Sequence, residues 1–261
     1  MRGERRWYDS LGLKALYWAL VLYLFLPILV MVLMGFKDSR FIGFPIRHFT
    51  LKWYGTVLQD TEIMGAFGYS VIIAVVSTIL SLLIGLNIGV FLGRVTFWGR
   101  GIAFGLMLLP AVIPGIISGI SLRLFIKLLA IEPGTLALIL GHTIHNVPFV
   151  AIMILSRLKA MNPSLEEAAM DLGADELITF CRVTLPFLKP ALVGATVFSL
   201  LISFDDFIRS YFLAGYSLTL PVLIFAKLRF GMSPEINAIS TLVLLITVTA
   251  GLVTERFLRR R

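Results

Sequence analysis

Ser164–Pro186, with the sequence SLEEAAMDLGADELITFCRVTLP, is a long charged insert between two apolar runs of membrane length. Ser164 precedes Glu167 by three residues. That is the spacing of a capping box, in which each side chain bonds a free backbone amide of the other residue. Gly173 suits the end of this helix, because glycine readily adopts the left-handed conformation that follows many helices. The pattern predicts a short helix that ends in a glycine corner.

The expected helix has one small apolar face. Leu165, Ala168, Ala169 and Leu172 recur at helical spacing, and the acidic side chains point elsewhere. Such a face favours contact with a partner over a freely solvated loop. A second short helix is expected from 175 to 183, and 184–186 should end it because Pro cannot continue a helix interior.

The spacing within this insert resembles the signature loop of the permease subunits of ATP-binding-cassette importers. The loop reads Glu-Ala-Ala, three residues, Gly, nine residues, an apolar β-branched residue, one residue and Leu-Pro, with Val183 here where the family has Ile. In that family the first helix is the coupling helix, which sits in a cleft of a cytoplasmic ATPase. The resemblance implies ATPase-coupling roles for Glu167, Ala168, Ala169, Gly173, Leu185 and Pro186.

The composition is that of an integral membrane protein. Of the 261 residues, 58% are hydrophobic and 15% are charged, which is too apolar for a soluble domain of this size. The net charge of +8 is better explained by basic residues that set membrane orientation than by nucleic-acid binding. With Cys181 as its one cysteine, the chain is not expected to form an internal disulfide or to hold a metal.

Six apolar runs are long enough to cross a bilayer. They lie at about 16–36, 68–92, 102–122, 136–155, 187–204 and 236–253. We therefore expect an all-α membrane protein with six transmembrane helices. Its parts would be a cytoplasmic N-terminal segment 1–15, a first transmembrane helix 16–36, an external segment 37–67, a transmembrane core 68–254 with a cytoplasmic coupling loop 157–189, and a basic cytoplasmic tail 255–261.

Charge predicts the orientation of these runs. Six crossings put both termini on one side of the membrane. If that side is the cytoplasm, it holds fourteen of the 23 basic residues, in agreement with the excess of Lys and Arg in cytoplasmic loops. The insert 164–186 then also faces the cytoplasm.

Two of the runs carry small or helix-breaking residues. Gly85, Gly89 and Gly93 recur every four residues, which favours either a close helix interface or a simple tolerance of glycine in membrane helices. Pro110 and Pro114 interrupt the third run, so a kink is expected there. Broken helices at membrane depth usually line cavities, which makes both prolines candidates for the wall of a translocation path.

The fourth run contains His142, His145 and Asn146, for which hydrogen bonds between helices are the preferred interpretation over substrate contact.

The fifth run ends at two adjacent carboxylates, Asp205 and Asp206. They lie roughly 24 Å along a helix from Lys189, towards the far side of the bilayer. The pair could attract a cation, or it could mark the helix end with Arg209 neutralising one acid. Nearby aromatic faces suit an ammonium group, although an interfacial aromatic belt is the ordinary alternative. The candidate substrate path comprises Asp205, Asp206, Phe204, Phe207, Tyr211, Pro110 and Pro114.

The sequence shows no means of binding ATP and no reaction centre. It has no Gly-rich phosphate loop with the Gly-Lys-Ser/Thr ending, and no set of nucleophile and base. We expect a chain that is not an enzyme and holds no cofactor of its own. ATP and Mg would be bound by a partner ATPase.

Further segments resemble the spermidine/putrescine branch of these permeases, namely 203–207, 220–221 and 231–238. The resemblance implies a type I importer fold in a bacterial inner membrane, a permease heterodimer, two cytoplasmic ATPases and an external solute-binding protein. The expected cargo is a polyamine-like cation. Another small solute such as iron, an opine or a phosphonate is the alternative within this class. An ion-driven secondary transporter and a membrane enzyme are the alternatives outside it.

Overall fold

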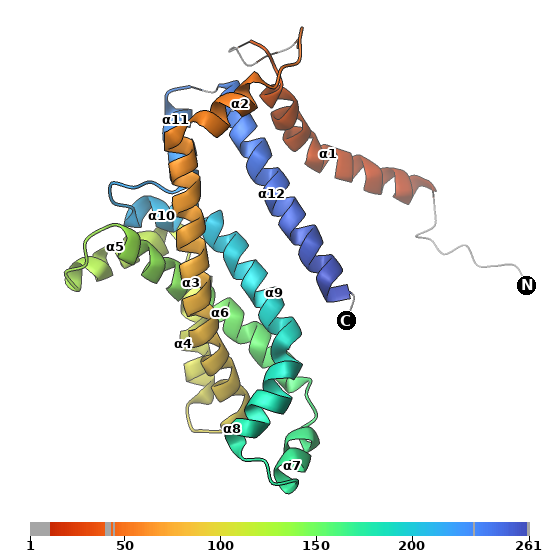
Figure 1. Cartoon of the computed structure of the whole chain (residues 1–261), viewed down its shortest axis with the longest axis vertical. Coiled ribbons are helices and arrows are strands. Elements are labelled where there is room, and N and C mark those ends of the chain that lie inside the picture. The colour runs from red at the N-terminus through yellow and green to blue at the C-terminus, as the bar shows by residue number, and fades with distance from the viewer. Residues whose placement is uncertain (1–10, 40–42, 44, 232, 260–261) are drawn as a thin grey trace, which may run out of the picture. The chain divides into compact units, whose positions relative to one another are not determined.

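The computed structural model describes residues 11–39, 43, 45–231 and 233–259, and within them the protein is helical (Figure 1). The described residues contain one isolated β-bridge, between Lys37 and Phe49. The helices are α1 (Leu11–Gly35), α2 (Lys52–Gln59), α3 (Thr61–Arg94), α4 (Arg100–Val112), α5 (Gly115–Leu128), α6 (Thr135–Lys159), α7 (Ser164–Asp171), α8 (Glu176–Thr179), α9 (Leu185–Phe204), α10 (Phe207–Leu213), α11 (Leu220–Arg229) and α12 (Pro234–Arg259), with a π-helical turn at Phe180–Thr184.

The expected all-α membrane architecture is confirmed. Among the residues that the structure describes, five stretches are long and apolar enough to cross a membrane: Gly12–Gly35, Thr61–Arg94, Thr135–Lys159, Glu176–Phe204 and Pro234–Arg256. Helices α4 and α5 form a sixth span if they are counted together, although they bend by 104° at the break between them. The bend lies at Ile113 and Pro114, inside the region where a kink was expected.

The chain divides into two compact units, and the first comprises 1–64 and 226–246. The Trp53 indole donates to the Lys37 carbonyl over 2.6 Å, which fastens α2 to the end of α1. Gly35 is needed there, because a Cβ at this position would lie 3.3 Å from the Ala238 backbone nitrogen in α12. Lys227 forms an ion pair with Glu62 at 3.0 Å.

The second unit comprises 65–225 and 247–261, and α6 lies at its centre. Helix α6 packs against α4, α5, α9 and α10, and its apolar residues contribute to two buried clusters. The glycine stripe of α3 is an intramolecular interface. A Cβ on Gly85 or Gly89 would lie within 2.9 Å of α6 atoms, so the two helices are in close contact.

Two local expectations about the insert were wrong. Ser164 does not cap α7, because the residue before it, Pro163, is already helical, and the Asn162 side chain instead accepts from the Ser164 amide at 3.2 Å. The second helix does not end at 184–186. It continues through the π-helical turn into α9, whose second residue is Pro186.

Candidate functional site

The break between α9 and α10 gives its two adjacent acids different roles. Asp205 follows the last residue of α9 and is exposed. Asp206 is buried and caps α10: its carboxylate accepts from the Arg209 amide at 3.1 Å and pairs with the Arg209 guanidinium. Arg209 therefore neutralises one acid, which was one of the two alternatives, and Asp205 is the acid that remains accessible.

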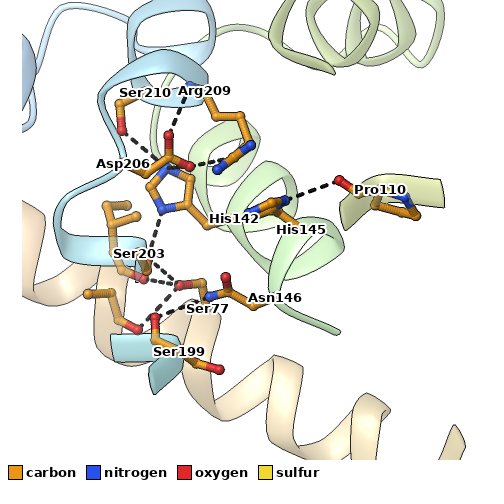
Figure 2. Close-up of polar contacts among 12 residues, drawn as sticks. Ser77, Pro110, His142, His145, Asn146, Ser199, Ser203, Asp206, Arg209 and Ser210 are labelled. Atoms are coloured by element: carbon orange, nitrogen blue, oxygen red, sulfur yellow. Dashed lines mark hydrogen bonds and ion pairs between the residues drawn. The ribbon is translucent and has the colours of Figure 1, made fainter. Parts of the chain in front are cut away.

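Buried polar contacts fasten this break to α6 (Figure 2). His142 is 1% exposed and contacts a serine on each side of the break, Ser203 at 2.7 Å through Nδ1 and Ser210 at 3.1 Å through Nε2. Its Nε2 also lies 3.9 Å from the Asp206 carboxylate. Because a hydroxyl can donate or accept, the two serines satisfy the imidazole in either neutral tautomer.

The same network reaches α3 and the middle of α9 (Figure 2). The hydroxyls of Ser77 and Ser203 form a hydrogen bond of 2.9 Å. Asn146, one turn along α6 from His142, donates to the Ser199 carbonyl at 3.3 Å. The expectation that these polar residues bond between helices is confirmed. The network holds α3, α6, α9 and α10 together around the break.

The kink between α4 and α5 is connected to α6 by His145. Pro114 has no amide to donate to the Pro110 carbonyl, which would be its partner in a continuous helix. His145 Nδ1 lies 3.2 Å from that carbonyl (Figure 2). Since a carbonyl only accepts, Nδ1 carries the proton in this contact. Pro110 is thereby connected to the helix that carries His142, and Pro114 directly precedes α5.

The predicted aromatic residues fall into two groups. Phe204 packs edge-on against Phe67 of α3, with ring centroids 5.7 Å apart. Phe207 and Tyr211 form a cluster with Phe225 of α11, with centroid distances of 4.7 Å from Phe207 to Phe225 and 5.6 Å from Phe207 to Tyr211. The break thus presents an accessible carboxylate next in sequence to an aromatic cluster.

The predicted coupling residues lie elsewhere in the second unit, in and after α7. Glu167 and Ala168 are exposed and Ala169 is half-buried. Gly173 has a φ of +91°, a conformation that side chains disfavour, and it ends α7 as expected.

Leu185 and Pro186 begin α9, so the motif spans α7, the glycine corner, α8 and the start of a membrane helix. In the part of the chain that the structure describes, no group of three or more His, Cys, Asp and Glu side chains is arranged for a metal ion.

Several residues that build these sites were not singled out from the sequence. Ser199 and Ser203 are one turn apart on α9, and this spacing of polar residues within an apolar run was an available signal. Ser210 carried no such signal. The sequence motif contains Glu167, yet its neighbour Glu166 is the glutamate that contacts the rest of the chain, through Arg94.

Sequence comparisons with a family model and with individual proteins both point to membrane components of transport systems. Residues 85–260 match the family described as "Binding-protein-dependent transport system inner membrane component". The spermidine/putrescine transport system permease protein PotC of Escherichia coli K12 is 33% identical over 242 residues, covering 92% of this chain and 91% of that protein. The putrescine transport system permease protein PotI of the same strain is 35% identical over 230 residues, covering 85% and 82%.

Solved structures share the fold at lower identity. A chain of a bacterial ABC transporter involved in the import of the acidic polysaccharide alginate aligns with a TM-score of 0.76 and 18% identity, covering 98% of this chain and 99% of that one. A chain of the inward-facing MetNI methionine ABC transporter aligns with a TM-score of 0.63 and 22% identity, covering 76% and 94%. The fold is therefore that of ABC importer permeases, and it accommodates cargoes of very different chemistry.

Proposed function

Since this chain belongs to the family of inner membrane components of binding-protein-dependent transport systems, and is the permease subunit of an ATP-driven importer, we propose that it carries polyamine-like cations. Spermidine and putrescine are the cargoes named for the PotC and PotI relatives. The chain does not hydrolyse ATP itself, because the ATPase of this family is a separate subunit.

The observation that carries the polyamine proposal is the accessible carboxylate at the α9–α10 break. Asp206 is paired with Arg209, so its charge is already neutralised within the protein. Asp205 is exposed and precedes the aromatic cluster of Phe207, Tyr211 and Phe225. A carboxylate and aromatic rings on the same short segment suit an alkylammonium group, because such a group is attracted both by the charge and by the ring faces. Asp205 would therefore contact the cation as it passes.

The proposed assembly contains a second, related permease, two cytoplasmic ATPases and an external solute-binding protein. Support comes from the alginate transporter, which shares the fold and has been crystallised with a substrate-bound periplasmic protein. ATP and Mg would bind to the ATPase subunits. Helix α7, with Glu167 and Ala168 exposed, would be the coupling helix that enters a cleft of one ATPase.

The proposed orientation has both termini and α7 in the cytoplasm. It is supported by the basic residues that concentrate on that side, among them Arg94 and Arg100 next to the α3–α4 connection. Closure of the ATPases on ATP would move α7, and the membrane helices would then change from an inward-open to an outward-open state. Such coupling requires that ATP bind the two states with different affinities.

The test is uptake of radiolabelled spermidine and putrescine by cells that rely on this transporter. Asp205→Asn should lower uptake by roughly tenfold, which corresponds to the free energy of one charge-assisted hydrogen bond. The amount of assembled complex should stay the same. Asp38→Asn, which removes another exposed carboxylate, is the matched control and should leave uptake unchanged.

Normal polyamine uptake by the Asp205→Asn variant would exclude Asp205 from the substrate path. Absence of polyamine uptake by the unaltered complex, with uptake of a metal chelate or phosphonate instead, would overturn the assigned cargo. Uptake driven by an ion gradient without ATP would overturn the importer mechanism.

A further inference from the structure

Three side chains join α7 to the two membrane-spanning helices beside it. Arg94 is the last residue of α3, Glu166 is in the first turn of α7, and Thr184 closes the π-helical turn before α9. The Arg94 guanidinium donates to Glu166 Oε1 and, over 2.7 Å, to Thr184 Oγ1. The Thr184 hydroxyl donates to the same Glu166 oxygen. We refer to Arg94, Glu166 and Thr184 as the α7 brace.

Apart from the brace, α7 packs on α8 and on the π-helical turn, without burying any of its own residues. It is eight residues long and none of its residues is buried. A helix of that length is marginal on its own in water, so it depends on contacts outside itself. The ends of α7 are shaped by Asn162 and Gly173, but those are local turns. The Glu166 side chain is 20% exposed, which leaves its ionic contact only partly screened by water.

The other end of the brace rests on a well-packed part of the unit. Thr184 is fully buried, and its neighbour Val183 packs on the cluster that contains Ile154 and Leu188. Arg94 follows Gly93 of the glycine stripe, whose Cβ position faces Leu158 of α6. Glu176 of α8 adds a further electrostatic attraction to Arg94. A displacement of α7 would therefore pull on both α3 and α9.

We propose that the α7 brace transmits movement of the coupling helix to the membrane helices, with Glu166 as a positioning residue and Arg94 as its anchor. The inference rests on the proposed coupling function of α7. Two adjacent glutamates then have different roles. Glu166 faces inward and holds α7 to α3 and α9, whereas Glu167 is exposed and available to the ATPase. Transport per ATP then depends on Glu166, and attachment of the ATPase depends on Glu167.

The test uses the assembled complex, with its ATPases and binding protein, reconstituted in vesicles. Uptake of spermidine and ATP hydrolysis are measured together, and hydrogen exchange of the α7 amides is measured on the same preparation. Glu166→Ala should keep the ATPase attached and hydrolysing, but should lower spermidine transported per ATP by roughly fivefold or more, in the range of allosteric coupling. Exchange in α7 should become faster. Thr184→Val, which keeps the side-chain shape, should give a smaller change in the same direction.

Charge reversal separates the brace from general folding. Arg94→Glu and Glu166→Arg should each lower transport per ATP, and the double variant should recover much of it, because the pair is restored in the opposite sense. Asp171→Asn, also on α7 and exposed, is the matched control. Unchanged transport per ATP and unchanged α7 exchange in Glu166→Ala and Thr184→Val would overturn the brace. So would a double variant no better than the single ones.

The proposed coupling function fails in a different way. If Glu167→Lys leaves both the ATPase and uptake unaffected, then α7 is not the coupling helix. If Glu167→Lys releases the ATPase while the Glu166 variants remain fully coupled, only the brace is wrong.

Discussion

Two neighbouring carboxylates, Asp205 and Asp206, show how the fold assigns different tasks to identical residues. The chain direction changes between them, so one side chain caps α10 from inside the unit and the other lies at its surface. The buried acid is compensated by Arg209 and lies near His142. Its removal is therefore expected to affect stability, whereas removal of the exposed acid is expected to affect transport alone.

Asp206→Asn should destabilise the protein because it leaves the Arg209 guanidinium buried without its counter-charge. Breaking such a pair costs about 3–5 kcal/mol, so the melting temperature of the detergent-solubilised protein should fall by several degrees or more. Asp205→Asn should leave the melting temperature unchanged. The double variant Asp206→Asn with Arg209→Met should recover part of the loss. Equal melting temperatures for all of these variants would contradict the buried ion pair.

At the scale of elements, α6 organises the second unit by two kinds of contact. One portion carries His142 and Asn146, which bond to α9 and α10. A later portion carries Val150 and Ile154, which fit against the glycines of α3. Polar bonds fix the rotation of α6 about its axis, and the glycines let α3 approach closely enough for dispersion contacts, which are the main attraction between helices in lipid.

Gly89→Ala is expected to disturb the α3–α6 interface, because the added methyl group would lie 2.9 Å from the Ala151 carbonyl oxygen and from Ile154. A backbone atom cannot rotate away, and overpacking of this kind costs about 1–3 kcal/mol. Gly194→Ala on α9 is the control, since nothing lies within 4 Å of its Cβ position. The measurement is thermal unfolding together with the yield of folded protein. Identical results for the two variants would show that α3 and α6 are not in close contact.

At the scale of the whole molecule, the break at α9–α10 and the α7 segment belong to the same unit but occupy opposite ends of α9. Helix α9 runs from the motif residues Leu185 and Pro186 to Phe204, which precedes Asp205, so one helix connects the proposed coupling site with the proposed substrate path. A displacement of one end of α9 can therefore move the other end without any change in the conformation of the residues between them.

Purification of this chain from gently solubilised membranes should recover a second six-helix permease and an ATPase with a phosphate-binding loop, identified by mass spectrometry.

Gly173→Leu should remain in the membrane but lose the ATPase, because leucine disfavours the φ of +91° that ends α7. Gly194→Leu, with open space at its Cβ position, is the control. Full ATPase recovery with Gly173→Leu would contradict the role of the glycine corner.

Features that depend on local order in the chain could be predicted from the sequence. The apolar runs, the proline kink, the glycine corner and the signature spacing of 167–186 are set by residues close together in the chain, so their positions could be predicted. The start of α7 was predicted too, but not its cap, because Pro163 adopts helical angles and passes that role to Asn162.

Which polar residues bond to one another depends instead on how the helices pack. Arg94 and Glu166 are 72 residues apart, His142 and Ser203 are 61 apart, and Ser77 and Ser203 are 126 apart. No local pattern links such pairs, because they meet only when α3, α6, α7 and α9 pack. The same packing buries Asp206 and leaves Asp205 accessible, and it turns Glu166 inward and Glu167 outward. The physical reason is desolvation: a charge that is withdrawn from water needs a partner, and the fold supplies Arg209 to the buried Asp206 and Arg94 to the half-buried Glu166.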